Sequence, residues 1–333
     1  MGEGRWAALL PLIGAALPVL GLIAAMQPST GARAPAPLPK PAVKPSYLWP
    51  ASWPIETAEQ RAALRTEVRR CGMRCVLLGW DTWARPEAAW MPRPGVRELV
   101  GELHADGVLV GAQTMPVLAH PQARWLDRWA TGVVEPDGWR QLDDQGCQIN
   151  IAQIAYWYVA CGFDRVYADG WEGIGARNEQ GQWIDPARGG VHDAEAVQKI
   201  AARSDAMHLA LRDAILTRGG RIYWYETSEG RFDGQYLDWG GETFRAFCGR
   251  IVAAREYLMA RWGQEVPVTF GQVPLWHPTR GNPPLAEFAV LCDLAITHDS
   301  PLAVALWPAA ANDPEWPVWA ALIRRAEQAR AGH

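Results

Sequence analysis

Several features that mark common protein classes are missing from this chain of 333 residues. Its 32 basic and 36 acidic residues give a net charge of -4, and no run of five like charges occurs, so a nucleic-acid partner is not expected. Lysine is scarce and stands only at positions 40, 44 and 199. The P-loop, G-x-G-x-x-G, G-x-S-x-G and H-E-x-x-H patterns are also missing, which disfavours nucleotide, serine-hydrolase and zincin chemistry.

Cysteine is infrequent as well, with six residues at positions 71, 75, 147, 161, 248 and 292. An even set can pair in an oxidising compartment, but buried free thiols are the commoner state and spacing does not reveal partners. Cys71 and Cys75 lie four apart without a second close pair or a matching histidine spacing, which disfavours a zinc site. We expect no metal ion and no organic cofactor.

One long hydrophobic run occurs, over residues 6–26, with Pro11 and Pro18 inside it. It is long enough to cross a bilayer of about 30 Å. We predict a signal peptide or membrane anchor over 1–34, a Pro-rich spacer over 35–45 and one domain over 46–333. This segment predicts export to the periplasm, the cell surface or the medium. We expect membrane contact only through this segment. The basic residues lie mostly after the run, against the charge bias of an N-in anchor, so cleavage and anchoring both stay open.

Tryptophan, in contrast, is abundant, with 19 residues, many in segments that read as loops or strand ends. Flat aromatic faces stack on sugar rings, so part of this set is expected near a carbohydrate. The alternative is that most of these side chains fill the layers of a large core, where aromatic residues bury much apolar area.

Beyond residue 45, short β-rich runs alternate with helical patterns, as in βα units around a parallel sheet. Eight such units predict a (β/α)8 TIM barrel, and a doubly wound open sheet is the alternative because local patterns do not reveal closure. The expected strands are 46–50, 74–80, 107–115, 164–169, 221–225, 267–273, 293–297 and 302–307. The expected helices are 56–70, 95–105, 151–161, 192–217, 242–262, 284–291 and 315–329.

Two carboxylates follow apolar strands of this pattern, and TIM barrels place their active sites at that end of the strands. Asp169 precedes Gly170, which allows a sharp turn, and Glu226 ends the next strand. Glycoside hydrolysis needs such a pair, one carboxylate to balance the oxocarbenium-like charge and one carboxyl to protonate the leaving oxygen. For each acid alone, the alternative is a strand-end carboxylate that pairs with arginine or caps a helix.

The run Val-Leu-Leu-Gly-Trp-Asp at 76–81, the run Leu-Val-Gly-Glu-Leu-His-Ala-Asp-Gly-Val-Leu-Val-Gly at 99–111 and the segment 162–172 resemble the α-galactosidase (melibiase-like) group of TIM-barrel glycoside hydrolases. The resemblance covers about a third of the chain. It implies that Asp169 is the nucleophile and that Asp81 binds substrate hydroxyls. In that group the acid/base ends the sixth strand, whereas 267–276 has no acid here. Glu226, Glu172 and Asp238 are the candidates for this role, in that order.

We therefore expect an exported, retaining glycosidase that acts on oligo- or polysaccharide. The alternative is a non-catalytic carbohydrate-binding or scaffold barrel, which the missing acid on the sixth strand favours. Further substrate contacts are expected from aromatic and polar residues at strand ends, namely Trp80, Trp171, Tyr225, Trp276, His277 and Trp307.

Overall fold

The structure is a computed structural model that describes residues 38–134, 138–169, 194–227, 235–237, 246, 249, 268–279 and 281–331. Residues 35–333 form one compact unit, and the described residues all belong to it. The hydrophobic segment at 6–26 lies outside them. In the described ranges, no helix combines the length and the apolar character that a bilayer crossing requires.

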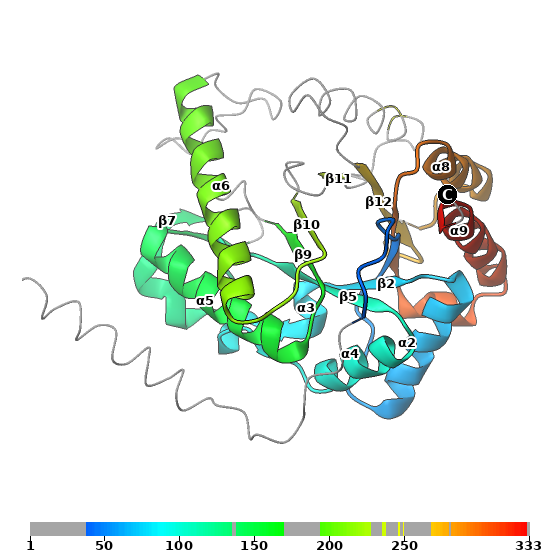
Figure 1. The fold of residues 1–333 in the computed structure, drawn as a ribbon, viewed down its shortest axis with the longest axis horizontal. Helices are drawn as coiled ribbons and strands as arrows, with labels where there is room; N and C mark the ends of the chain where they lie inside the picture. Colours follow the sequence, from blue (N-terminus) through cyan, green and yellow to red (C-terminus); the bar gives the residue numbers. More distant parts are fainter. Residues whose placement is uncertain are drawn as a thin grey trace, which may run out of the picture. The chain divides into compact units, whose positions relative to one another are not determined.

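Eight parallel strands close into a barrel, in the order β1-β13-β12-β11-β10-β9-β5-β2 (Figure 1). Along the chain they are β1 (Tyr47–Pro50), β2 (Cys75–Leu78), β5 (Leu109–Thr114), β9 (Arg165–Ala168), β10 (Trp224–Thr227), β11 (Gln235–Leu237), β12 (Val268–Leu275) and β13 (Leu302–Leu306). The expected α/β class with a curled parallel sheet is confirmed, and the closing pair is β1 with β13, in register from Tyr47↔Ala303 to Pro50↔Leu306.

Alternate residues of the strands whose side chains are described fill the barrel, because successive side chains of a strand point to opposite faces. Tyr47, Trp49, Leu77, Tyr167 and Trp224 form part of this interior core. The small residues Ala303 and Ala305 of β13 lie beside them, which leaves room for the large rings.

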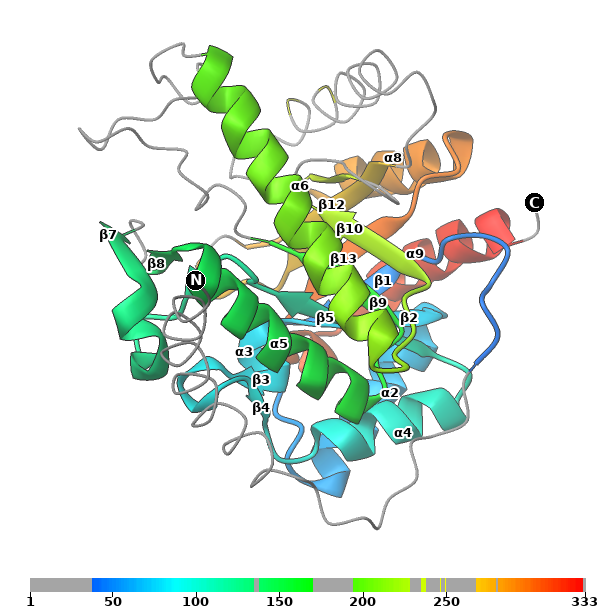
Figure 2. The same cartoon turned by 60° about the vertical axis from the view of Figure 1, so that its left-hand side comes forward.

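Helices cover the outside of the barrel: α2 (Ala58–Cys71), α4 (Val96–Ala105), α5 (Asp144–Cys161), α6 (Ala194–Thr217), α8 (Leu285–Thr297) and α9 (Trp316–Ala331). Local sequence sets their ends. Thr57 and Gln60 form a capping box at the start of α2, and Gly72 ends it in the left-handed conformation. Figure 2 shows α5 and α6 side by side along the outer face of β9 and β10.

Three expected strands need correction, and one strand was not expected at all. The segment 293–297 is the last part of α8, so a strand there is wrong. The segment 267–273 does form a strand, but β12 is the seventh of the barrel, because β11 precedes it. Residues Gln235–Leu237 show no strand pattern, since β11 is only 3 residues long. The fifth strand, expected at 221–225, is β10 and begins three residues later, at Trp224.

Two insertions follow the ends of β2 and β5. After β2 come the short helix α3 (Trp80–Trp83) and the hairpin of β3 (Ala84–Arg85) and β4 (Met91–Pro92). After β5 comes an antiparallel sheet in the order β6-β8-β7. Its strands are β6 (Leu118–Ala119), β7 (Ala130–Val134) and β8 (Arg140–Leu142), with a 3-10 helix at Arg124–Trp129. The insertions lie where strands end, which is the side on which barrel enzymes bind substrate.

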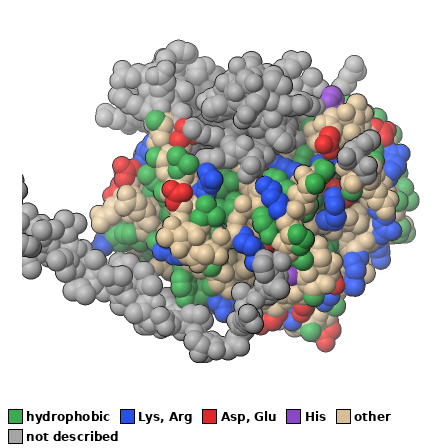
Figure 3. All heavy atoms as spheres, in the orientation of Figure 1, with side chains coloured by type: hydrophobic (Ala, Val, Ile, Leu, Met, Phe, Trp, Pro, Cys, Tyr) green, Lys and Arg blue, Asp and Glu red, His purple; other side chains and the backbone are tan. Residues whose placement is uncertain are grey.

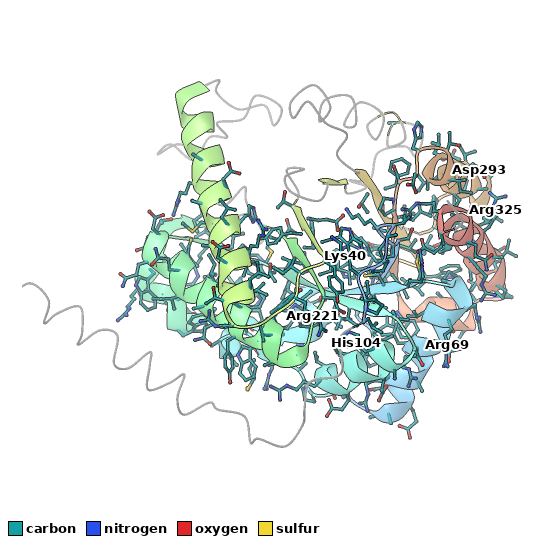
Figure 4. The ribbon with its side chains drawn as sticks, viewed as in Figure 1. Lys40, Arg69, His104, Arg221, Asp293 and Arg325 are labelled. Atoms are coloured by element: carbon teal, nitrogen blue, oxygen red, sulfur yellow. The ribbon has the colours of Figure 1, made fainter. Side chains whose placement is uncertain are left out.

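Residues 38–45, part of the expected spacer, contact the barrel at the end where its strands begin. Leu38 packs against the interior core, and its carbonyl accepts a hydrogen bond from the Tyr223 hydroxyl. Lys40 Nζ lies 5.3 Å from the centre of the Trp224 ring. In Figure 4, Lys40 lies near the middle of the ring of strands. Basic side chains accordingly stand near the middle of the described part of the face in Figure 3.

Five cysteines lie in the described ranges, and all five are buried free thiols. Burial raises the pKa of the Cys161 and Cys292 thiols to about 12. Cys248 lies outside the described residues. These five thiols therefore act as small apolar core residues.

Candidate functional site

Asp169 lies at the mouth of the barrel, one residue after β9. Arg165 and Tyr167 of this strand point into the barrel, so the alternation of the strand carries Asp169 toward the barrel axis. Its backbone N–H donates to the Thr114 carbonyl at 2.9 Å, which continues the pairing of β5 with β9 past the last strand residue. The half-buried carboxylate is thereby fixed to the rim of the ring of strands.

Gln113 orients this carboxylate. Its Nε2 donates to Asp169 Oδ2 at 3.0 Å, and its Oε1 accepts from the Trp80 backbone N–H at 3.2 Å. The second bond fixes which end of the amide is the donor, because only an oxygen accepts from N–H. Sequence reasoning missed Gln113. The available signal was a lone amide at an inward position of the apolar strand β5, in register with Tyr167.

Asp81 lies beside this chain of bonds, in α3 after the end of β2. Its Oδ1 accepts from the Thr82 hydroxyl at 3.4 Å. A Cβ on Gly79 would lie 2.6 Å from Asp81 Oδ1 and 2.8 Å from Trp49 Nε1, so only glycine allows these groups to approach. One face of Asp81 is open to solvent, but the protein around its carboxyl raises its pKa through desolvation, against the opposing effects of its hydrogen bonds and of Arg93.

Aromatic rings gather in two groups at strand ends. The Trp80 ring lies 5.3 Å from His120 and 5.1 Å from Trp139, and the last two belong to the insertion after β5. The His277 and Trp307 rings, after β12 and β13, lie 4.6 Å apart in an edge arrangement. The structure therefore brings the predicted residues Trp80, His277 and Trp307 to the expected end of the barrel, half-buried.

Glu226 is fully buried inside the barrel and lies below this rim. Its carboxylate forms ion pairs with Lys44 and Arg165, and Thr269 Oγ1 donates to its Oε1 at 2.6 Å. Lys44 precedes β1, Arg165 is the first residue of β9, and Thr269 is the second residue of β12. Burial alone would raise the pKa of Glu226, but the two cations and the hydroxyl outweigh it and hold this pKa well below its ordinary value.

This position differs from the one expected for Glu226. A proton donor needs a carboxyl that is protonated near the working pH and that reaches the substrate. Glu226 is buried and paired with Lys44 and Arg165, which keep it ionised near neutral pH, so its place fits a structural role. The ring of Tyr47 covers Arg165 at 4.1 Å and adds to this buried cluster.

Tyr225 and Trp276 also differ from expectation. Because Glu226 points inward, Tyr225 points outward, where its ring packs on His208 of α6 and its hydroxyl lies 3.2 Å from His208 Nδ1. Trp276 has a φ of 59° and turns toward the helices, where its ring packs against Trp316 and Trp319 and its Nε1 donates to Asp313 at 2.7 Å. Both side chains are packing residues of the helical layer.

Three further predicted residues, Glu172, Trp171 and Asp238, lie outside the described residues. The strand assignment nevertheless bears on Asp238. It directly follows Leu237, the last residue of β11, and β11 is the sixth strand of the barrel along the chain. The departure from the α-galactosidase pattern noted above rested on the wrong sixth strand.

His104 lies in the run at 99–111 that resembles the α-galactosidase group, and it has a structural role here. His104 Nε2 lies 2.7 Å from Asp164 Oδ2, the residue before β9. The same carboxylate accepts from the Val110 backbone N–H at 3.0 Å and from Arg221 at 2.9 Å. This network ties β5, β9 and the loop before β10 together at the end opposite to Asp169.

The site can supply an oriented carboxylate at Asp169, the carboxyl of Asp81 after β2, and aromatic rings at the ends of neighbouring strands. Among the described residues, no group of three or more His, Cys, Asp or Glu side chains is arranged to hold a metal ion. The chemistry that such a set supports is acid and nucleophilic catalysis by carboxylates.

Comparisons with known proteins locate this fold among glycosidases. No family model and no curated protein matches the sequence. Solved structures that resemble it include a GH36 α-galactosidase from Geobacillus stearothermophilus in complex with raffinose, at a TM-score of 0.57 and 12% identity over 87% of this chain and 42% of that one. The Thermus thermophilus α-galactosidase in complex with stachyose has a TM-score of 0.55 and 15% identity over 87% of this chain and 66% of that one. A GH27 β-L-arabinopyranosidase from Geobacillus stearothermophilus in complex with arabinose has a TM-score of 0.56 and 15% identity over 87% of this chain and 77% of that one.

These similarities establish a shared fold. The chain spans 42% of the length of the GH36 α-galactosidases and 66% of the Thermus enzyme. The resemblance to α-galactosidase-like barrels, first seen in short motifs, is confirmed at the level of the fold.

Proposed function

We propose that this protein is a retaining glycoside hydrolase that cleaves α-D-galactosides or their stereochemical equivalents, β-L-arabinopyranosides, with Asp169 as nucleophile and Asp238 as acid/base. One observation carries the proposal. Asp169 follows the fourth strand of the barrel and is oriented there by Gln113. Asp238 follows the last residue of the sixth strand in the sequence. In the α-galactosidase group, the fourth strand bears the nucleophile and the sixth strand bears the acid/base.

Each step has a residue on the chain. The Asp169 carboxylate attacks the anomeric carbon as the bond to the leaving oxygen breaks, while the carboxyl of Asp238 protonates that oxygen. Asp238 then takes a proton from water, which attacks the anomeric carbon and releases Asp169. Gln113 holds the nucleophile in one orientation, and Asp81 accepts hydrogen bonds from hydroxyls of the sugar.

Glu226 has no part in this mechanism. Its charge is neutralised by Lys44 and Arg165, so it can neither donate a proton at neutral pH nor approach a substrate at the rim. The alternative of a binding-only barrel was favoured by a missing acid on the sixth strand. Because β11 is the sixth strand, Asp238 follows it in the sequence. The missing acid therefore no longer favours a binding-only barrel.

The test is hydrolysis of aryl α-D-galactopyranosides and aryl β-L-arabinopyranosides by the full chain. We expect Asp169→Asn to lose essentially all activity, and Asp238→Asn to lose about 10²- to 10⁴-fold on substrates with poor leaving groups. Glu226→Gln should keep its rate at temperatures where it stays folded. A wild-type protein that binds these sugars and hydrolyses none of them would contradict the proposal.

Export of the protein is a further part of the proposal, based on the hydrophobic segment at 6–26. Activity or antigen in the periplasmic or extracellular fraction of expressing cells is the expected result, and confinement to the cytoplasm would contradict it.

A further inference from the structure

The end of the barrel at which the strands begin, opposite to Asp169, carries an excess of exposed positive charge. Four exposed cations make up this basic end: Lys40, Arg69, Arg218 and Arg324. Among the described residues, none of the four has a carboxylate as an ion-pair partner. Their charged groups donate to backbone carbonyls or lie over an aromatic ring, so their charge is not cancelled locally.

The order of the chain places these cations together. Arg69 lies in the last turn of α2, which leads into β2, and Arg218 directly follows α6, which leads into β10. Arg324 Nη2 donates to the Arg69 carbonyl at 2.9 Å, so α9 brings this side chain to the same end. Lys40 Nζ lies 5.3 Å from the ring of Trp224, the first residue of β10. All four cations therefore lie where β2 and β10 begin.

The carboxylates at this end are largely neutralised. Five of them pair with arginines, in the pairs Glu67–Arg70, Glu327–Arg74, Asp164–Arg221, Asp106–Arg65 and Asp299–Arg330. Arg212 and Asp213, near the end of α6, are both exposed and offset each other. The four cations of the basic end therefore give this part of the described surface a net positive charge.

This charge is opposite in sign to that of the whole chain. The net charge of the chain is -4, so an anionic surface repels the protein on average. Charges at a surface act over a Debye length of about 8 Å at physiological ionic strength, so the side chains that face the surface dominate the interaction. An anionic surface therefore attracts this protein in one orientation, with the basic end toward it.

The segment before β1 joins the hydrophobic run at 6–26 to this same end. Leu38 packs against the interior core, and Arg330 Nη2 donates to the Lys44 carbonyl at 2.8 Å, which fixes the segment across the barrel. Eleven residues, 27–37, separate the run from Leu38. A chain of this length spans at most about 40 Å. A run inserted in a bilayer would therefore hold the basic end close to the membrane surface.

We propose that the basic end docks on an anionic lipid bilayer, so that the barrel stands on the membrane with its mouth pointing away from it. Lys40, Arg69, Arg218 and Arg324 lie against the lipid headgroups. Asp169 is at the opposite end and stays open to substrates in solution. This inference goes beyond the proposed hydrolysis and does not depend on it.

The test measures which end of the full chain lies near the lipid. A donor dye is attached to a cysteine placed by Gln328→Cys, in the last turn of α9, or by Gln122→Cys, in the insertion after β5 at the mouth. Both positions are exposed. Energy transfer to a headgroup-labelled lipid is measured on vesicles of phosphatidylcholine alone and of phosphatidylcholine with phosphatidylglycerol in equal parts. The chain without an added cysteine gives the background.

Three double variants test the role of charge. Arg69→Glu with Arg218→Glu reverses two cations of the basic end, and Arg69→Lys with Arg218→Lys keeps their charge. Arg124→Glu with Arg128→Glu is the matched control, because both arginines are exposed in the 3-10 helix at the mouth and the change in net charge is the same.

We expect strong transfer from position 328 and weak transfer from position 122 on the vesicles that contain phosphatidylglycerol. Each basic residue near such a surface strengthens binding by about fivefold. Transfer from position 328 should therefore fall to the level of phosphatidylcholine vesicles in the Arg69→Glu, Arg218→Glu variant, and also at about 1 M salt, where charges are screened. The lysine variant and the control variant should match the unsubstituted chain.

Equal transfer from the two positions, or no increase at position 328 when phosphatidylglycerol is present, would overturn the proposal. Absence of transfer from both positions would overturn it as well. A loss of transfer as large in the Arg124→Glu, Arg128→Glu control as in the Arg69→Glu, Arg218→Glu variant would show that net charge, and not the basic end, governs binding. No sugar takes part in this measurement, so its outcome is independent of the proposed hydrolysis.

Discussion

Gln113 Nε2 donates a 3.0 Å hydrogen bond to Asp169 Oδ2 across the neighbouring strands β5 and β9. The same amide is fixed by the Trp80 backbone N–H, so one side chain connects the ends of the second, third and fourth strands of the barrel. A nucleophile that must attack along one direction depends on such an orienting contact.

Gln113→Ala should therefore lower kcat by about 10- to 100-fold with little change in KM, because the carboxylate loses its orientation and the sugar keeps its other contacts. Gln113→Glu should add a second carboxyl beside Asp169 and move the acidic limb of the pH profile to higher pH. The measurement is kcat against pH for both variants. An unchanged kcat in both would show that Gln113 has no positioning role.

The buried cluster around Glu226 predicts a loss of stability that depends on pH. Its pKa in the folded protein is about 2, below the value of about 4.3 in an unfolded chain, so its ion pairs stabilise the fold above the unfolded pKa and lose this effect as pH falls toward 2. Glu226→Gln should cost about 3 to 5 kcal/mol at pH 7, because Arg165 and Lys44 stay buried without their anion.

Urea unfolding of wild type and Glu226→Gln at pH 7 and at pH 3 measures this effect. The difference in unfolding free energy should shrink at the lower pH. Lys44→Met is the partner variant and should cost less than Glu226→Gln, since Arg165 still pairs with the carboxylate. A difference that stays constant with pH would contradict the assignment of Glu226 as a structural anion.

Gly79 sets the position of Asp81. In Gly79→Ala the new Cβ would lie 2.6 Å from Asp81 Oδ1 and 2.8 Å from Trp49 Nε1, so the carboxylate must move. We expect KM for an aryl galactoside to rise about tenfold or more. The free energy of unfolding should change by less than the binding free energy that this rise in KM represents. Gly249→Ala is the matched control, because a Cβ there meets nothing within 4 Å. Equal kinetics in the two variants would remove Asp81 from the substrate site.

Tyr225 provides a test of side-chain direction on β10. Its hydroxyl faces His208 Nδ1 at 3.2 Å in the helical layer. Tyr225→Phe should lower the unfolding free energy by about 0.5 to 1.5 kcal/mol and leave KM unchanged. A raised KM with unchanged stability would mean that Tyr225 reaches the substrate.

These cases show which parts of the fold are readable from sequence. The alternation of β-rich and helical runs predicted the barrel, and the acid after the fourth strand marked Asp169, because both signals are local. On β10, however, Tyr225 and Glu226 were both assigned to the site although neighbouring strand residues face opposite sides. The choice between them depends on Lys44 and Arg165, which are distant in sequence.

The assignment of the later strands failed for a related reason. β11 has 3 residues, too few for an alternating pattern, and is defined by its pairing with β10 and β12. The end of α8 carries Ile296 and Thr297, β-branched residues that favour strands in isolation but lie here in a helix between barrel strands. Its pairing makes β11 the sixth strand of the closed barrel, and Asp238 is the next residue of the sequence after Leu237.

The central claim is that Asp169 is the nucleophile of a retaining glycosidase. The most direct measurement is labelling with a fluorinated galactosyl fluoride, in which the carboxylate displaces fluoride and the ring fluorine slows release of the sugar. Intact mass and peptide mapping should show one sugar per chain, attached to the peptide that contains Asp169. A label on another carboxylate, or hydrolysis of galactosides that gives the inverted anomer without any label, would contradict the account.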